Sequence, residues 1–479
     1  MKEYSLIGYK LIDDFKFNLN KINIIVGENS SGKSSFLRSF QLLKQSMYFS
    51  LENLNTNLKE GIDFGSYSNL VKNGSGEHIQ FKIVFNDSIQ SYGNFFIKGV
   101  EWEYRKNNLT RIKVNLEDTY IEVLLSNKKV KQVFFFNKEL KIFEDNIVKY
   151  HPGKCFPVIS SFIQNSIYSR ISSAVENNLL DKNKVMDLVM FFFRNEELMK
   201  LNNKLEFEIF SQDEKRIKDT KKMIQNFNQL EEFKNSEIEF MVDKILEDAG
   251  KELKRKFGTV IYTGAIRATG ERYYRIMESE YSEVECTVNN DVSKKLYNLK
   301  LKDSNNLELF NKFIKEHFGF RVNIETLKSN DEEIFFYVEI EENNMKNNLV
   351  DVGAGYSQIL PILYAFFGKG RNNFATIIIE QPELHLHPKM QSDLLDLILK
   401  LSKVNPNLKI IIETHSPLLI DRIGKHIYKK NYQNKDINVF IFNKKEDNLE
   451  IKKTEFNEQG LLKEWPIRFF SAKELKEWS

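Results

Sequence analysis

The sequence predicts an α/β protein that combines a mixed sheet with an antiparallel β lobe and a helical insertion. Three patterns support this prediction. Apolar runs typical of buried strands lie near both ends of the chain, at residues 21–26, 374–380 and 408–413. Between these ends, residues 78–150 alternate apolar and polar side chains with a period of two, which indicates an antiparallel meander. Residues 162–256 show helical periodicity and few glycines, which indicates a helical insertion.

The composition limits the class of protein. The chain has 479 residues, which at about 150 residues per domain corresponds to roughly three structural units. Its 70 basic and 67 acidic residues nearly balance, which argues against a uniformly basic surface but leaves a local basic patch open. The two cysteines, Cys155 and Cys286, have no metal-binding spacing and suit a reducing compartment. Because no apolar run approaches the roughly 18 residues of a membrane span, we expect a cytoplasmic protein without membrane contact.

The N-terminal region is expected to form three short strands followed by a glycine-rich loop. The third strand leads into the pattern G-x-x-x-x-G-K-S at residues 27–34, and an amphipathic helix then runs to about Met47. The two glycines permit backbone conformations that direct successive N–H groups at one point, where the start of the helix adds partial positive charge. The strands are expected at Tyr4–Lys10, Phe15–Leu19 and Lys21–Val26.

The residue types of this loop are those of a phosphate-binding site. Lys33 can reach the β- and γ-phosphates of a nucleotide, and the Ser34 hydroxyl can ligate Mg²⁺. A chance turn of glycine, serine and lysine is the alternative, but all fixed positions are filled and the flanking strand and helix are both expected. The loop therefore predicts a nucleoside triphosphate site, with contacts from Gly27, Asn29, Ser30, Gly32, Lys33, Ser34 and Ser35.

Two more buried strands and a second glycine-rich turn lie in the C-terminal half. The strand at 374–380 ends in Glu380, where a carboxylate can support Mg²⁺ through its water shell, and the sequence QPELHLHP follows it. The strand at 408–413 leads into Thr414-His415-Ser416. Residues 350–358, VDVGAGYSQ, form a glycine-rich turn that precedes a helix.

These motifs, in this order, resemble the ABC-type ATPase clan, and within it the SMC/RecF-like and OLD-like bacterial ATPases of the AAA group. The patterns VDVGxGxSQxLP and ExPExHLHP carry the resemblance, which includes residues 261–268 and 460–470 and covers only residues 80–255 poorly. Several such relatives belong to anti-phage defence operons, including Septu-type and retron-linked ATPases. The resemblance implies an ABC-type P-loop ATPase head. Its parts would be 1–75 with the P-loop, an antiparallel β lobe at 76–155, a helical insertion at 160–255, and 256–479 with a short C-terminal cap.

The resemblance also assigns roles to individual residues. It implies ATP and Mg²⁺ as cofactors, with Ser34 and Glu380 at the metal, and two heads that dimerise around ATP. Ser357, beside two glycines at a helix start, can supply the donors that a phosphate needs from the opposite subunit. The segment expected to contact the γ-phosphate in this way is Gly355, Tyr356, Ser357 and Gln358, while His387 lies in the loop that crosses the interface and His415 senses the γ-phosphate.

One position departs from the family pattern. The usual catalytic glutamate follows the strand-ending acid directly, and here that position is Gln381. A glutamine can orient a water molecule but is a poor general base. Glu383 is a substitute if the turn at Pro382 returns its carboxylate to the water. We therefore expect slow turnover, with Glu380, Gln381, Glu383 and His415 as the catalytic group.

Several residues have alternative interpretations. His385, His387 and His415, with Glu380 and Glu413 close in sequence, resemble a zinc ligand set. Arg267 is either a structural ion pair or a phosphate or partner contact. The charged run at 213–255 is either a solvated helix face or a surface for a partner or nucleic acid. The C-terminal aromatic residues are either a packing anchor or a base-stacking platform, and they are Trp465, Phe469 and Phe470.

Two functions from different classes follow from the resemblance. The first is an ATPase whose ATP-dependent assembly, as a homodimer or a higher oligomer, controls a partner effector such as a nuclease or toxin in anti-phage defence. The second is a DNA-repair or DNA-clamping ATPase that binds nucleic acid directly. A transporter nucleotide-binding subunit is disfavoured by Gln381, the long insertion and the ELHLHP stretch.

Overall fold

The structure is a computed structural model. It describes residues 1–57, 62–72, 78–91, 95–135, 138–140, 147–150, 154–158, 231–265, 267, 270–276, 292–302, 304–329, 332–367, 374–445 and 448–464. Most of the expected helical insertion, and the aromatic residues Trp465, Phe469 and Phe470, lie outside these residues.

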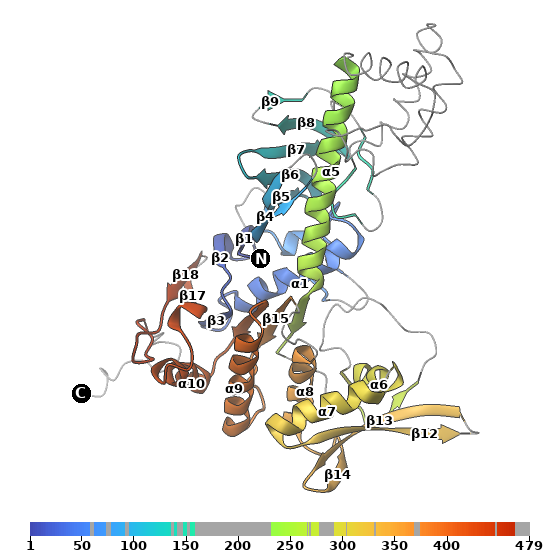
Figure 1. Cartoon of the computed structure of the whole chain (residues 1–479), viewed down its shortest axis with the longest axis vertical. Helices are drawn as coiled ribbons and strands as arrows, with labels where there is room; N and C mark the ends of the chain where they lie inside the picture. The colour runs from blue at the N-terminus through green and yellow to red at the C-terminus, as the bar shows by residue number, and fades with distance from the viewer. Residues whose placement is uncertain are drawn as a thin grey trace, which may run out of the picture.

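A six-stranded sheet forms the centre of the molecule (Figure 1). Five of its strands are mutually parallel, and the sixth pairs antiparallel at one edge. The expected buried strands are here, because apolar runs can be buried on both faces of a parallel sheet. Its order is β10 (Val260–Thr263), β15 (Ala375–Glu380), β16 (Leu408–Glu413), β3 (Ile22–Gly27), β17 (Ile437–Lys445) and β18 (Asn448–Thr454).

Helices cover both faces of this sheet. Alternate side chains point to opposite faces of a strand, so Ile378 and Ile411 share a core with α1, while Ile379 and Ile412 share one with α8 and α9. Ile22, Ile24 and Val26 of β3, which are buried, pack against α9 and α10. The helices are α1 (Lys33–Phe49), α8 (Ala354–Phe366), α9 (Pro388–Val404) and α10 (Pro417–Tyr428).

A second, eight-stranded sheet is antiparallel throughout. Burial alternates along its strands, because one face packs on the core that α1 and the long helix α5 (Glu231–Gly258) also line. The strands β1 and β2 precede the glycine-rich loop in sequence but belong to this sheet. Its order is β2 (Ile12–Asn18), β1 (Glu3–Tyr9), β4 (His78–Gln90), β5 (Phe96–Arg105), β6 (Asn108–Leu116), β7 (Tyr120–Ser126), β8 (Lys129–Phe135) and β9 (Lys138–Glu139).

A third, small antiparallel sheet lies at the opposite end of the molecule from this lobe (Figure 1). Its core is continuous with that beneath α8. It contains β11 (Tyr274–Arg275), β12 (Arg321–Ser329), β13 (Glu332–Glu342) and β14 (Met345–Asn348), covered by α6 (Val292–Lys302) and α7 (Ser304–Phe318). Two short 3₁₀ helices, η1 (Tyr67–Asn69) and η6 (Asn434–Asp436), complete the described elements.

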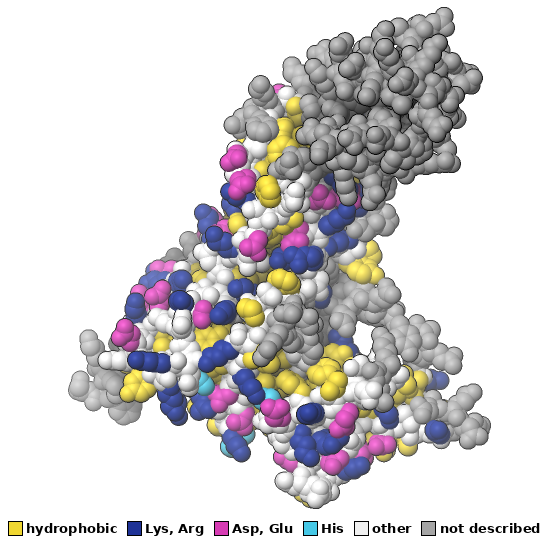
Figure 2. All heavy atoms as spheres, in the orientation of Figure 1, with side chains coloured by type: hydrophobic (Ala, Val, Ile, Leu, Met, Phe, Trp, Pro, Cys, Tyr) yellow, Lys and Arg dark blue, Asp and Glu magenta, His cyan; other side chains and the backbone are white. Residues whose placement is uncertain are grey.

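The predicted fold class is confirmed, since the described residues form an α/β molecule with a mixed sheet and an antiparallel lobe. Among these residues, no helix combines the length and the apolar character needed to cross a membrane. Basic and acidic side chains are interspersed over the face seen in Figure 2, as the near balance of charge predicts.

Candidate active site

The glycine-rich loop joins β3 to α1 in a form that only glycine permits at two points. Gly27 has a φ of 147°, and a Cβ there would lie 2.1 Å from the carbonyl oxygen of Phe442 on β17. Gly32 has a φ of 90° and is the N-cap of α1, without a side-chain cap. The first turn of α1 also contains no acidic residue. Its backbone N–H groups and partial positive charge therefore meet no competing carboxylate in that turn.

Lys33, the first residue of α1, is buried with 3% of its surface exposed. Its ammonium group donates hydrogen bonds to the carbonyl oxygens of Gly27, at 3.0 Å, and Glu28, at 2.8 Å. Burial lowers the pKa of Lys33, and the nearby Glu413 and Glu28 carboxylates counteract that effect. The ammonium is thus held over the loop, at the start of the helix. The neighbouring loop residues Asn29 and Ser30 are exposed.

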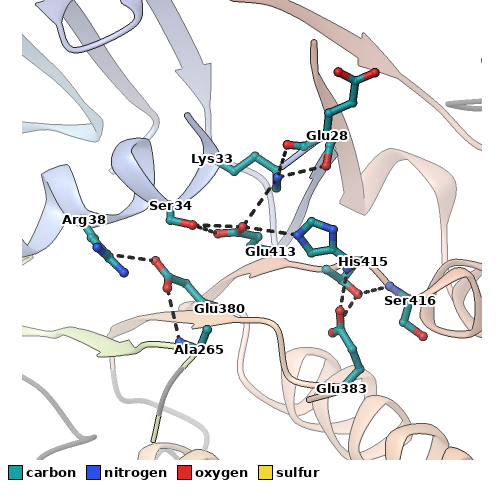
Figure 3. Close-up of polar contacts among 12 residues, drawn as sticks. Glu28, Lys33, Ser34, Arg38, Ala265, Glu380, Glu383, Glu413, His415 and Ser416 are labelled. Carbon is teal, nitrogen blue, oxygen red and sulfur yellow. Dashed lines mark hydrogen bonds and ion pairs between the residues drawn. The ribbon is translucent and has the colours of Figure 1, made fainter. Parts of the chain in front are cut away.

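The carboxylate that contacts Ser34 belongs to Glu413, a residue for which the sequence predicted no part in the nucleotide site. The Ser34 hydroxyl lies 3.1 and 3.0 Å from the two Glu413 oxygens, and the Lys33 ammonium lies 3.9 Å from one of them (Figure 3). Glu413 is 1% exposed and ends β16, the direct neighbour of β3. A signal was present in the sequence, since an apolar strand that ends in an acid is the same feature that identified Glu380.

Glu380 also ends a buried strand and is 1% exposed, but its contacts are different. It accepts hydrogen bonds from the Tyr262 hydroxyl and, at 3.3 Å, from the backbone N–H of Ala265. Arg38 Nε lies 3.6 Å away, and Figure 3 shows the contacts with Arg38 and Ala265. Burial raises the pKa of Glu380, as does the neighbouring Glu413. The described contacts include no hydrogen bond between Glu380 and Ser34, the pair predicted to hold the metal.

The oxygen atoms at Ser34 suit Mg²⁺. A serine hydroxyl and a carboxylate are hard oxygen ligands, and Mg²⁺ commonly takes one or two such protein ligands together with the phosphates of a nucleotide. The zinc alternative finds no support, because no three His, Cys, Asp or Glu side chains among the described residues gather as a metal set. His385 and His387 are both exposed, and the His387 ring caps α9 by accepting from the Lys389 N–H.

The loops that follow β15 and β16 are joined by hydrogen bonds. Gln381 has a φ of 43°, and its N–H donates to the Glu413 carbonyl at 2.7 Å. The Glu383 carboxylate accepts from the His415 N–H at 2.6 Å and from the Thr414 hydroxyl at 2.9 Å. Burial raises the pKa of Glu383, although these hydrogen bonds act in the opposite direction. His415 Nε2 in turn lies 3.9 Å from a Glu413 oxygen.

The second glycine-rich turn leads into α8. Gly353, its N-cap, has a φ of 79° and provides no side-chain cap. The Ser357 hydroxyl donates to the Ala354 carbonyl at 2.8 Å, and both Ser357 and Gln358 are buried. A Cβ added at Gly355 would lie 3.4 Å from the carbonyl oxygen of His385, so the first turn of α8 touches the loop that precedes α9. Among the described contacts, no hydrogen bond or ion pair joins this turn to Lys33 or Ser34.

Arg267 connects the two regions through the backbone. Its guanidinium, 1% exposed, donates to the carbonyls of Glu380, at 2.6 Å, and Gln381, at 3.3 Å, while its own carbonyl accepts from Gln358. Burial lowers the pKa of Arg267 to about 10. Its described hydrogen bonds therefore go from Nη2 to backbone carbonyls, while Nε and Nη1 are buried without a hydrogen-bond partner among the described residues.

Comparison with known proteins adds a family to this geometry. Solved SMC head domains, one bound to the C-winged helix domain of ScpA and one from Thermotoga maritima, align with 95% and 94% of this chain and 97% of their own. Identity is 10% in both, with TM-scores of 0.38 and 0.35. The "Retron Vc95 probable ATPase" of Vibrio cholerae serotype O1 biovar El Tor is 22% identical over 432 residues, 88% of this chain and 71% of that protein. The family profile of the AAA ATPase domain matches residues 1–420, and the chain belongs to that family.

Proposed function

We propose that this chain binds ATP with Mg²⁺ between β3 and α1, hydrolyses it slowly, and uses ATP-dependent pairing of two copies to control a partner effector. The observation that carries the proposal is the start of α1, where Lys33 and Ser34 stand at an uncapped helix end beside a buried carboxylate. Such an end attracts an anion, and the lysine and serine add a point charge and a metal ligand.

Phosphate binding would replace contacts that the loop now makes with itself. The Lys33 ammonium exchanges the carbonyls of Gly27 and Glu28 for phosphate oxygens, which are stronger, charged acceptors. Ser34 and a strand-ending carboxylate hold Mg²⁺, which neutralises charge on the phosphates when bound. The N–H groups around Gly32 and Ser35 complete the cradle.

Slow hydrolysis is supported by the side chain at position 381. The Gln381 amide can orient an attacking water but cannot remove its proton. The Glu383 carboxylate is engaged by the N–H of His415 and the hydroxyl of Thr414, so its role is to hold His415 beside Glu413. His415 then lies where it can respond to the γ-phosphate.

Pairing of two copies is supported by the start of α8. It offers a second uncapped helix end, but without a lysine or a metal ligand and without a described contact to the loop at Lys33. A phosphate held by α1 of one copy can accept further hydrogen bonds from the segment at Gly355 and Ser357 of another copy. The loop with His385 and His387 touches Gly355, and it would lie at the same interface.

The proposed control of an effector is supported by similarity to a known relative. One relative is named as the probable ATPase of a retron. With the resemblance to retron-linked ATPases of defence operons, this supports a role in anti-phage defence, in which nucleotide state restrains or releases a nuclease or toxin. ATP can favour the paired state only through contacts that the single copy lacks.

The test combines nucleotide binding with assembly. Isothermal titration of the full chain with ATP should give binding, and sedimentation should show a dimer with ATP and Mg²⁺ that dissociates without nucleotide. Absence of ATP binding would overturn the proposal. DNA affinity that falls steeply with salt, in the absence of a partner protein, would favour the DNA-clamping alternative, because that slope counts neutralised phosphates.

A further inference from the structure

Arg267 is a buried arginine that uses only part of its hydrogen-bonding capacity. Its side chain is almost fully enclosed, and its Nη2 donates to the backbone carbonyls of Glu380, at 2.6 Å, and Gln381, at 3.3 Å. Its Nε and Nη1 have no hydrogen-bond partner among the described residues. Burial of a charged group is costly where its donors stay unpaired. The position of Arg267 therefore requires an explanation beyond stability.

The backbone that Arg267 contacts has an unusual conformation. Gln381 has a φ of 43°, in the left-handed region that residues other than glycine seldom adopt. Its N–H donates to the Glu413 carbonyl at 2.7 Å, and its own carbonyl accepts from Arg267. Such a conformation persists only where the surrounding structure fixes it. Arg267 thus helps to hold position 381, whose side chain is proposed to orient the attacking water.

The backbone of Arg267 contacts α8 on its other side. The Arg267 carbonyl accepts a hydrogen bond from Gln358 Nε2 at 3.2 Å. Gln358 lies on α8 and is buried, so its amide faces Arg267 of the same chain. Gln358 Oε1 is also buried without a partner among the described residues. Arg267 therefore touches both the helix proposed to meet a second copy and the residue proposed to act in its own site.

The guanidinium of Arg267 keeps its charge at neutral pH. Burial lowers the pKa of Arg267 to about 10, and the nearby Glu383 and Glu380 carboxylates counteract this effect. A protonated guanidinium retains all its donors, so Nε and Nη1 can bind an acceptor that a shift of α8 brings near. Because a hydrogen bond is strong in a low-dielectric interior, a small movement of this kind changes the contacts of Arg267 substantially.

We propose that Arg267 is a positioning residue that links α8 to Gln381. Association of two copies at the start of α8 acts on Arg267 through Gln358, and Arg267 acts on Gln381 through its backbone carbonyl. Each chain thereby couples its contact with the other copy to hydrolysis in its own loop. The assignment rests on the proposed function and adds the residues that connect assembly with turnover.

The test separates ATP binding from turnover in the full chain. Calorimetry measures ATP affinity, sedimentation measures the ATP-dependent dimer, and phosphate release gives kcat, KM and the single-turnover rate. Arg267→Lys keeps the charge but replaces the planar guanidinium, and Gln358→Leu removes the amide at the other end. Gln45→Leu is the matched control, because Gln45 is a buried glutamine toward the far end of α1 that donates to the carbonyls of Asn55 and Ile62.

The expected result is a loss of turnover without a loss of binding. Arg267→Lys and Gln358→Leu should lower kcat at least about tenfold, with KM, ATP affinity and the ATP-dependent dimer within about twofold of the wild type. Gln45→Leu should keep the wild-type kcat. The single-turnover rate of Arg267→Lys is then measured in a Gln381→Ala background. A residue that acts through Gln381 adds little to the loss caused by Gln381→Ala, whereas an independent structural effect multiplies that loss.

Three results would overturn the assignment: an unchanged kcat in both variants, a loss confined to ATP affinity, or multiplied losses in the double variant. If Arg267→Lys does not fold, as circular dichroism would show, Gln358→Leu alone and combined with Gln381→Ala decides in the same way. A wild type that binds ATP and dimerises would leave the proposed function intact in each case. Absence of ATP binding or of an ATP-dependent dimer in the wild type would instead overturn the proposed function, and the link between α8 and Gln381 with it.

Discussion

The starts of α1 and α8 share one backbone feature and differ in everything around it. Each helix follows a glycine with positive φ, 90° at Gly32 and 79° at Gly353, and neither has a side-chain cap or an acidic residue in its first turn. At α1, a buried lysine and a serine stand beside the Glu413 carboxylate. At α8, the nearby serine bonds to its own helix, at Ala354. A helix end supplies a weak attraction for anions, and the neighbouring side chains decide its chemistry.

The neighbours differ because the two helices follow different structures. β3 lies inside the central sheet, so the acidic end of β16 lies next to the loop that follows it. The turn before α8 follows β14, on the small antiparallel sheet, where no described strand ends in a buried acid. We therefore propose that α1 forms most of the nucleotide site within one chain, whereas α8 completes the site of another copy.

Replacement of Lys33 should have the largest effect. Lys33→Ala removes a buried ammonium from the start of α1, and ATP affinity should fall about 100-fold or more, as expected for lost charge-assisted hydrogen bonds. Calorimetric titration measures this change. Lys400→Ala, which removes an exposed lysine on α9, is the control and should bind ATP normally. Retained affinity in Lys33→Ala would contradict the site.

A negative charge placed at the start of α8 should leave ATP binding intact but prevent the ATP-dependent association of two copies. Gly355→Asp adds a carboxylate where the added Cβ makes only an ordinary contact, and an acidic residue near a helix N-terminus favours the helix. The single copy should bind ATP as the wild type does, but the ATP-dependent dimer should be lost through repulsion of the γ-phosphate. Sedimentation with ATP and Mg²⁺ measures the dimer.

Gly355→Ala is the matched control without charge and should still pair. Mixing Lys33→Ala with Gly355→Asp gives a sharper comparison, because a mixed dimer joins the intact loop of one chain to the intact α8 of the other. Mixing should restore ATP-dependent dimers. Failure to restore them, or loss of ATP binding by Gly355→Asp alone, would contradict a site shared between two copies.

A smaller effect, on the rate of ATP hydrolysis, is expected from substitution of Gln381. Gln381→Glu supplies a general base next to the strand-ending acid, and the rate of ATP hydrolysis should rise about tenfold or more. Phosphate release under saturating ATP measures it. Gln381→Ala is the control, which should not exceed the wild-type rate. An unchanged or lower rate in Gln381→Glu would mean that position 381 does not adjoin the attacking water.

The smallest effect is expected on stability, between α9 and α10. Asp396 is fixed by Arg422 and His426, each within 2.9 Å; burial alone would raise its pKa, but these hydrogen bonds hold the pKa of Asp396 below its usual value. Its stabilisation is therefore present above the unfolded pKa of about 3.9 and lost as pH falls through the folded pKa.

Asp396→Asn should lower the free energy of unfolding at pH 7 by a few tenths to about 1 kcal/mol, since the partly exposed pair is screened by solvent. Denaturant unfolding at pH 7 and pH 3 measures it, and the difference from wild type should shrink at the lower pH. ATP binding and the ATP-dependent association of two copies should not change, because Asp396 lies at the start of neither α1 nor α8. A stability difference that grows toward pH 3 would contradict the ion pair of Asp396 with Arg422 and His426.

The glycine-rich loop and the buried strands around it can be predicted from the sequence. Glycine is favoured where φ is positive, as at Gly27 and Gly32, and at Gly27 the backbone of β17 also leaves no room for a Cβ. The apolar runs of β3, β15 and β16 predict buried strands without knowledge of their neighbours. The α/β class and the loop were therefore predictable.

Strand order was not predictable, and it decides which acid meets Ser34. Glu380 and Glu413 both end apolar runs of similar length, and a sequence does not state which strand pairs with β3. The long-range pairing of β16 with β3 brings Glu413 to the loop, and the pairing of β10 with β15 brings Tyr262 to Glu380. By itself the sequence determined the phosphate-binding loop, because its backbone demands are local. Only the tertiary structure decided which carboxylate lies beside it, because that depends on contacts between residues 379 positions apart.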